Sequence, residues 1–180
     1  MLILLSLSIG SVFAKRFKRP MVIHRVKKMG LEIWTEMEPE WKTELMMSGN
    51  KPVFVAHTPG NVYPPAGMTW MNYEEVILKP NEFPKVANSI LQTAARNYGL
   101  TLGERSKLKI KPTSYGSLHG YEALFVGTLA NGKKVDVKIF AGKADQKGPV
   151  TMQAYTNQGK MFHLNEQIRR SWSHTRYLNE

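Results

Sequence analysis

Residues 120–141 have the sequence GYEALFVGTLANGKKVDVKIFA. Its centre, Asn131-Gly132, separates two runs of strand-forming residues, 120–129 and 133–141. A two-residue turn of type I′ needs positive φ at both central residues, and Asn-Gly adopts it readily. In the second run apolar residues alternate with charged ones: Val135, Val137 and Ile139 with Lys134, Asp136 and Lys138. The stretch therefore predicts an antiparallel hairpin with one buried face.

Two segments outside this hairpin show the three-to-four residue spacing of amphipathic helices. The first, residues 81–98, carries its apolar stripe on Phe83, Val86, Ala87, Ile90, Leu91, Ala94 and Tyr98. The second is C-terminal, and its stripe consists of Met161, Leu164, Ile168, Trp172 and Thr175. These patterns predict a long central helix and a closing helix, both packed on a sheet.

Further strands are indicated on both sides of the central helix. Short apolar or alternating runs lie at residues 31–36, 52–56, 68–76, 107–111 and 150–156. The predicted order is three strands, a helix, four strands and a final helix. Strands and helices that are segregated in this way predict the α+β class, with a mostly antiparallel sheet and helices packed on it.

The chain has 180 residues, and its formal net charge is +11. This length fits one domain, which we expect over residues 30–178. Since the sequence contains no cysteine, disulfides, thiolate metal sites and cysteine nucleophiles are excluded.

The first fourteen residues, MLILLSLSIGSVFA, carry no charge. They are long enough for the apolar region of a signal peptide and too short for a membrane-spanning helix. Val12 and Ala14 fit the small-residue pattern of cleavage before Lys15, so residues 1–14 predict export to the periplasm or beyond the cell. A short membrane anchor with a cytoplasmic domain is the alternative, because basic residues follow at once.

Residues 15–29 form a basic arm. It contains no acidic residue and seven basic ones: Lys15, Arg16, Lys18, Arg19, Arg25, Lys27 and Lys28. Such an arm attracts anionic lipid or phosphate. We interpret it first as a solvated linker or topology signal, and second as a contact to a membrane surface.

A second group of basic residues lies on the predicted strands. Its members are Lys107, Lys109 and Lys111 on one strand and Lys134 and Lys138 on another. Because alternate residues of a strand point to the same side, these lysines can share one sheet face. They are the candidate surface for an acidic partner, and a merely solvated face is the alternative.

Catalytic patterns are weak in this chain. The five histidines (24, 57, 119, 163 and 174) show no metal-ligand spacing such as HExxH. Ser117 and His119 stand two residues apart without a nucleophile elbow. Glu36, Glu38 and Glu40 are a possible carboxylate cluster, but an exposed, charged strand end explains them as well. We therefore predict no catalytic residue, no metal site and no cofactor.

One family resemblance covers residues 30–175. It rests on the strand 31–36 running into Pro39 and Trp41, the long helix, the Gly120-Tyr121 and Asn131-Gly132 hairpin, and the final helix with Ser171 and Ser173. In this order the chain resembles the PsbP-like superfamily, which includes PsbP, the Ran-binding Mog protein and bacterial DcrB-like proteins. The resemblance implies an α/β/α sandwich without enzymatic activity, used for binding or assembly and often exported.

We therefore expect a non-catalytic, exported or envelope-associated binding or assembly protein with a basic surface. Its partner would be an acidic protein or an anionic envelope component, rather than nucleic acid. Two alternatives stay open: a small hydrolase that uses scattered His, Ser and Glu residues, and a cytoplasmic nucleic-acid binder.

Overall fold

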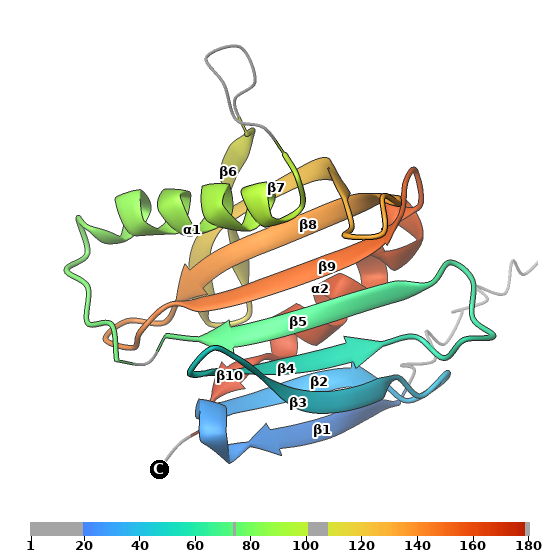
Figure 1. The fold of residues 1–180 in the computed structure, drawn as a ribbon. Helices are drawn as coiled ribbons and strands as arrows, with labels where there is room; N and C mark the ends of the chain where they lie inside the picture. The colour runs from blue at the N-terminus through green and yellow to red at the C-terminus, as the bar shows by residue number, and fades with distance from the viewer. Residues whose placement is uncertain (1–19, 74, 101–107, 179–180) are drawn as a thin grey trace, which may run out of the picture.

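The computed structural model describes residues 20–73, 75–100 and 108–178 (Figure 1). A seven-stranded antiparallel sheet has the strand order β3 (Lys42–Ser48), β4 (Lys51–His57), β5 (Ala66–Asn72), β9 (Val150–Asn157), β8 (Lys134–Lys143), β7 (Leu118–Thr128) and β6 (Ile110–Tyr115). A smaller sheet contains β1 (Met21–Val26), β2 (Leu31–Glu36) and β10 (Arg176–Tyr177). The helices are α1 (Phe83–Asn97) and α2 (Asn165–His174), and short 3-10 turns occupy Lys27–Met29 and Met161–Leu164. The predicted α+β class with an antiparallel sheet is confirmed.

Helix α1 lies across one face of the large sheet, and α2 lies behind it (Figure 1). Four of the five buried residues of α1 belong to the predicted stripe: Phe83, Ala87, Leu91 and Ala94. They share a core with Val135, Val137 and Ile139, the apolar side of the predicted hairpin. The alternation of apolar and charged residues in the sequence of β8 therefore correctly identifies the sheet face on which α1 packs.

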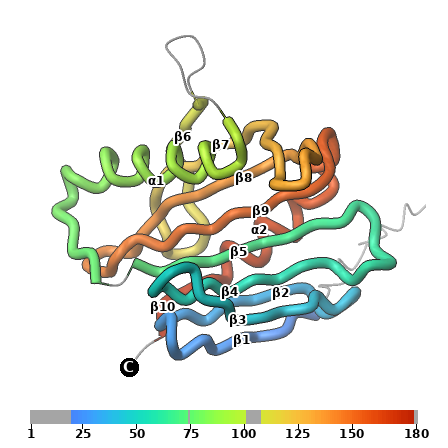
Figure 2. Tube along the Cα trace, viewed as in Figure 1, coloured from blue at the N-terminus to red at the C-terminus, as the bar shows by residue number. Residues whose placement is uncertain are grey.

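The opposite face of the large sheet packs on α2 and the small sheet. Trp70, Phe140 and Trp172 are fully buried there, next to Leu31 and Ile33 of β2. Each large side chain buried in this way contributes about 1.5–3 kcal/mol relative to exposure. The chain trace shows the small sheet beneath the β3–β4 side of the large one (Figure 2). No helix within the described ranges is long and apolar enough to cross a membrane.

The folded part begins before Gly30, so the predicted linker is wrong over residues 21–29. Residues 21–26 form β1, which pairs with β2 so that Val22 lies opposite Thr35 and Val26 opposite Leu31. The side chains of β1 alternate in burial: Val26 is buried, whereas Arg25 before it is exposed. The high density of basic residues concealed this alternation in the sequence. Lys15, Arg16, Lys18 and Arg19 lie outside the described residues.

The Asn131-Gly132 hairpin is confirmed, but the predicted type I′ turn is wrong. Of the two central turn residues, Gly132 has a positive φ, 80°, and Asn131 does not. The Gly132 N–H donates to the Leu129 carbonyl at 2.9 Å, and the Leu129 N–H donates to the Lys133 carbonyl at 2.9 Å. This is the pattern of a type I turn followed by a left-handed glycine.

Other strands also differ from the sequence prediction: β10 was not expected, and the strand predicted at 68–76 spans Ala66–Asn72. The edge strand β3 was not expected, because its side chains, including Leu45, Met46 and Met47, are mostly exposed and show no buried alternation. The strand predicted at 107–111 begins instead at Ile110. Lys109 therefore precedes β6, and Lys107 lies outside the described residues.

Candidate functional site

The strand register places Lys111, Lys134 and Lys138 on one side of the sheet, as predicted, and two of them pair with a carboxylate. Lys111 and Lys138 lie on the same side of the sheet as Phe140, where both pair with Glu122, at 3.0 and 3.5 Å. Lys134 donates a hydrogen bond to the Thr128 hydroxyl at 2.8 Å. Two of the five candidate residues therefore neutralise a buried carboxylate.

Glu122 is the centre of this cluster, with an exposed fraction of 5%. The Tyr115 hydroxyl donates to its Oε2 at 2.7 Å. Burial, the largest single effect, raises the pKa of Glu122, but the hydrogen bonds from Tyr115 and Lys111 and the charges of both lysines outweigh it and lower the pKa. Burial also raises the pKa of Tyr115, and its hydrogen bond to Glu122 adds to the rise. The cluster is an ionised, fully compensated carboxylate, which suits a structural role.

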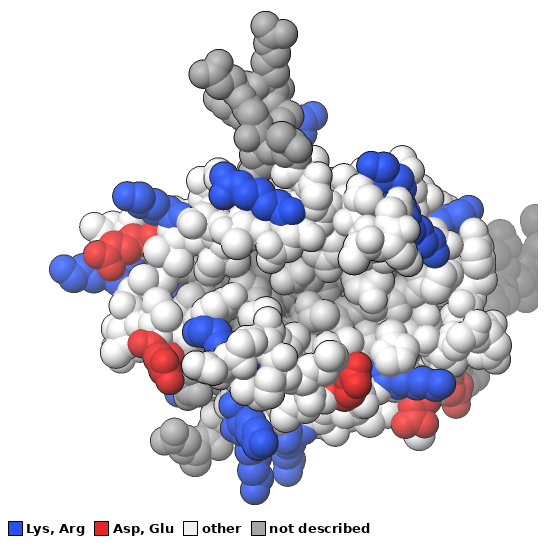
Figure 3. Space-filling model, in the orientation of Figure 1, with Lys and Arg blue, Asp and Glu red and all other residues white. Residues whose placement is uncertain are grey.

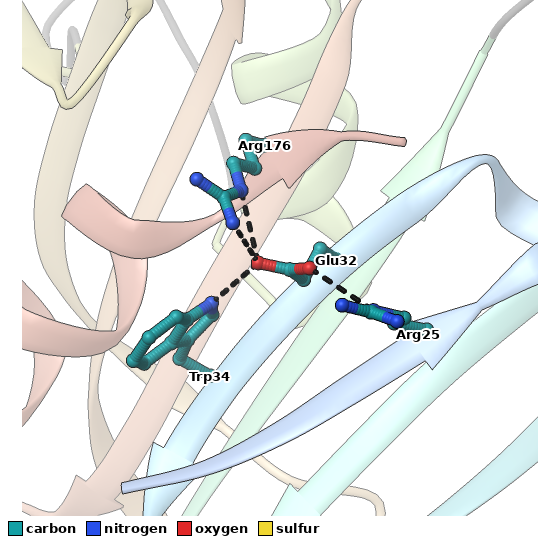
Figure 4. A network of polar contacts seen from close by, with 4 residues as sticks. All are labelled: Arg25, Glu32, Trp34 and Arg176. Carbon is teal, nitrogen blue, oxygen red and sulfur yellow. Dashed lines mark hydrogen bonds and ion pairs between the residues drawn. The ribbon is translucent and has the colours of Figure 1, made fainter. Parts of the chain in front are cut away.

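Part of the predicted arm holds a second buried carboxylate, Glu32 (Figure 4). Its Oε1 accepts from Arg176 Nε at 2.9 Å and from Trp34 Nε1 at 3.0 Å, and Arg25 Nε lies 3.4 Å from Oε2. The Trp34 hydrogen bond is the largest cause of the lowered pKa of Glu32; burial opposes it and the two arginines reinforce it. Arg25 is therefore paired with a carboxylate of β2, and it is exposed like Lys27 and Lys28.

The predicted row of exposed carboxylates is wrong for its first member. Glu36 has an exposed fraction of 3%, and one of its oxygens lies 3.4 Å from Arg170 Nη1 of α2. Glu38 and Glu40 are exposed in the bend that follows β2. The three side chains therefore have different environments, because α2 packs against β2 and covers Glu36.

An open groove of about 760 Å³ lies beside the start of α1. Its walls come from α1 and the loop before it, β6, β7, the end of β8 and the loop that follows: Pro80, Phe83, Pro84, Pro112, Thr113, Ser114, His119, Gly120, Tyr121, Lys143, Asp145 and Gln146. The rings of Phe83 and Tyr121 are 6.2 Å apart. Three prolines and these two rings make the walls largely apolar.

A row of three polar residues crosses this groove. Ser114 on β6 lies opposite His119 on β7, which lies opposite Lys143 on β8. The Ser114 Oγ is 2.8 Å from His119 Nδ1. Lys143 Nζ donates to the Asp145 carbonyl and lies 6.0 Å from the centre of the Phe83 ring. A hydroxyl, an imidazole and an ammonium thus stand side by side at one end of an apolar groove.

The arrangement is suited to receiving an anion. A carboxylate is the natural acceptor for an ammonium and a ring N–H held in one row. The sequence pairs His119 only with Ser117, which lies in the turn between β6 and β7, and it predicts no site there. The cross-strand partner is Ser114, and only the β6–β7 register could have identified it.

A second hollow, of about 240 Å³, lies where β4, β5, β8 and β9 meet the hairpin turn. It includes His57, Lys133 and Tyr155. The side of the molecule that carries α1 shows scattered Lys and Arg side chains around a largely uncharged hollow (Figure 3). The positive charge on this side is therefore distributed in single residues. Within the described ranges, no three His, Asp or Glu side chains gather as a metal site would require.

No family model matches the chain, and no curated protein matches it. A solved structure from Bacteroides thetaiotaomicron VPI-5482 is similar over 83% of the chain, with a TM-score of 0.53 and 7% sequence identity, and the chain spans 46% of that protein's length. LpqN of Mycobacterium tuberculosis, a protein involved in cell envelope biogenesis, is 11% identical, with a TM-score of 0.45 over 88% of this chain and 86% of LpqN. At these identities the likeness concerns the fold alone, and the predicted PsbP-like relationship stays a prediction.

Proposed function

We propose that this protein is a non-catalytic, envelope-associated binding or assembly protein that receives an acidic partner in the groove beside α1. The observation that carries the proposal is the row Ser114, His119 and Lys143 at the end of that groove. Its donors offer charge-assisted hydrogen bonds to an anion, and the apolar walls provide contact area for the rest of the partner.

The envelope part of the proposal rests on the chain's first residues. The uncharged segment 1–14 is followed by basic residues from Lys15 onward, which is the pattern on which export or anchoring was predicted. Retention in the periplasm or anchoring in the membrane would bring the folded part to an envelope surface. The identity of the partner as a protein or another anionic envelope component is addressed by the experiments below.

A hydrolase is the second candidate, because the groove brings Ser114 and His119 together and has Asp145 in its wall. In Ser-His-Asp hydrolases the serine uses Nε2 of the histidine and the carboxylate uses Nδ1. Here the Ser114 hydroxyl is hydrogen-bonded to Nδ1 of His119. This favours binding over nucleophilic catalysis. Hydrolysis of an activated ester by the full chain that disappears in Ser114→Ala would reverse that preference.

Site-specific photo-crosslinking in the native cells tests the proposal. A photoreactive residue is placed at Gln146 in the groove wall, and as a matched control at Lys134, an exposed position at the far end of β8. We expect an adduct in the envelope fraction from position 146, absent from position 134 and weakened by Lys143→Gln. Three results would overturn the proposal: an adduct whose yield is unchanged by Lys143→Gln, equal adducts from both positions, or a chain found only in the cytosol.

A further inference from the structure

We infer that the groove recognises an extended peptide segment in which an apolar residue and a carboxylate side chain stand two residues apart. This inference rests on the proposed function and names the chemistry of the partner. It is carried by two rows of residues that cross β6, β7 and β8 next to the start of α1.

The first row is apolar. Pro112 on β6 lies opposite Tyr121 on β7, and Tyr121 lies opposite Ala141 on β8. Phe83, the first residue of α1, stands over this row with its ring 6.2 Å from that of Tyr121. Phe83 is 8% exposed, so the core holds it in place while one edge stays open to the groove. Aromatic and proline surfaces of this kind pack well on a single apolar side chain.

The second row is the polar one, and its hydrogen bonds define where its donors point. When the Ser114 hydroxyl donates to His119 Nδ1, the ring proton is carried by Nε2, which is then a donor to a ligand. Lys143 donates to the carbonyl of Asp145, a neutral acceptor, so its positive charge stays uncompensated by that bond. The exposed Asp145 side chain, also in the groove wall, is the one like charge that an acidic ligand would meet there.

The two rows have a fixed separation. His119 and Tyr121 are two residues apart on β7 and point to the same face, which places the rows about 6.8 Å apart along the strand. An extended peptide repeats its own side chains on one face at the same interval. A peptide lying along β7 therefore sets an apolar side chain on Phe83 and Tyr121 and a carboxylate two residues away on His119 and Lys143.

The open form of the groove favours a peptide over a lipid tail. Most of its polar and apolar lining residues, including Pro80, Pro84 and Pro112, are exposed on one side. An acyl chain gains its binding energy from removal of nearly all its surface from water. An extended peptide tolerates water on one side, because its backbone is polar and only alternate side chains need to be buried.

Fluorescence polarisation with the full chain and labelled synthetic peptides tests the inference. The first peptide carries Leu and Asp separated by one Ser, the second has Asn in place of Asp, and the third has Leu and Asp adjacent. We expect the first to bind about tenfold more tightly than either other, the effect of one charge-assisted hydrogen bond. Equal binding of all three peptides, or binding of palmitate but of no peptide, would overturn the inference.

Matched variants locate the contact. Lys143→Gln is expected to weaken the first peptide about tenfold and to leave the Asn peptide unchanged, whereas Lys134→Gln affects neither. Loss of binding to both peptides in both variants would contradict the assignment. If the Gln146 adduct forms in cells while the three peptides fail to bind, this inference fails and the proposed function stands. If neither occurs, both fail.

Discussion

His119 lies directly opposite Lys143 in the antiparallel ladder between β7 and β8, and the same imidazole lies 2.8 Å from the Ser114 hydroxyl on β6. Each of the three neighbouring strands thus supplies one hydrogen-bond donor, and the three donors lie in one cross-strand row on the sheet face that carries α1. Since the strands are rigidly paired, the donors are positioned before any partner arrives, which reduces the entropy lost on binding.

Removing the one like charge in the groove should strengthen binding of an acidic ligand. Asp145→Asn eliminates a carboxylate from the wall without changing the side chain's size. We expect about a twofold gain in affinity for the Leu-Ser-Asp peptide, the size of an exposed charge interaction, and the gain should shrink at high salt. The measurement is peptide affinity at two salt concentrations. A weaker affinity in the variant would show that Asp145 itself contacts the ligand.

Glu122 makes the stability of the protein depend on pH. Its pKa is lower in the folded chain than in the unfolded one, so its contribution is present above the unfolded pKa of about 4.3 and is lost as pH falls through the folded value. We expect Glu122→Gln to reduce the free energy of unfolding by about 1–3 kcal/mol at pH 7. The difference from the unmodified chain should narrow below about pH 4.

Urea denaturation at several pH values checks this prediction. Glu44→Gln, on the exposed strand β3, is the matched control and should follow the unmodified chain at every pH. Glu32 also has a lowered pKa, so some loss of stability in acid should persist in Glu122→Gln. A constant gap between Glu122→Gln and the unmodified chain from pH 7 to pH 3 would contradict the assignment.

The β6–β7 turn packs tightly on the end of α2. Gly116 has φ 57°, and a Cβ there would lie 2.2 Å from the Ser173 carbonyl oxygen. Gly132 has φ 80° with open space around it. Both Ala substitutions incur the left-handed backbone penalty of about 1–2 kcal/mol, but Gly116→Ala must also displace α2, which adds at least about 1 kcal/mol. Equal losses of unfolding free energy in the two variants would show that this contact is not tight.

One buried hydrogen bond joins the C-terminal end of the chain to the middle of the large sheet. Trp70 Nε1 donates to Thr175 Oγ1 at 3.1 Å, and both residues are almost fully buried. Thr175→Val leaves the indole N–H without an acceptor, so we expect a loss of about 1–3 kcal/mol in chemical denaturation. Thr175→Ser keeps the hydroxyl and should retain most of the stability. Equal destabilisation by Val and Ser would assign the effect to packing instead.

Local periodicity accounts for the parts of the fold that the sequence predicts correctly. The hairpin around Gly132 and the stripe of α1 each have one face in the core, and a regular face leaves a regular pattern. Strand β3 is an edge with most side chains exposed, so no such pattern exists in it. Strand β1 does alternate between buried and exposed side chains, but its basic residues interrupt the apolar pattern, and the segment is therefore interpreted as a linker from the sequence alone.

The groove could not be predicted from local patterns. Phe83, Ser114, His119 and Lys143 come from four elements, and only the strand register and the packing of α1 bring them together. The pairing of Lys111 and Lys138 could not be predicted for the same reason, since their partner Glu122 comes from β7, between the strands that carry the two lysines. Charge in a sequence does not show which charges are already paired.

An NMR titration of the isotopically labelled full chain with the Leu-Ser-Asp peptide tests the central claim most directly. We predict saturable amide shifts that concentrate on the residues around Phe83, Ser114, His119, Tyr121 and Lys143, and that are absent around Lys134. Shifts centred on Lys111, Lys134 and Lys138, or no saturable shift at all, would contradict the claim that the groove beside α1 is the binding site.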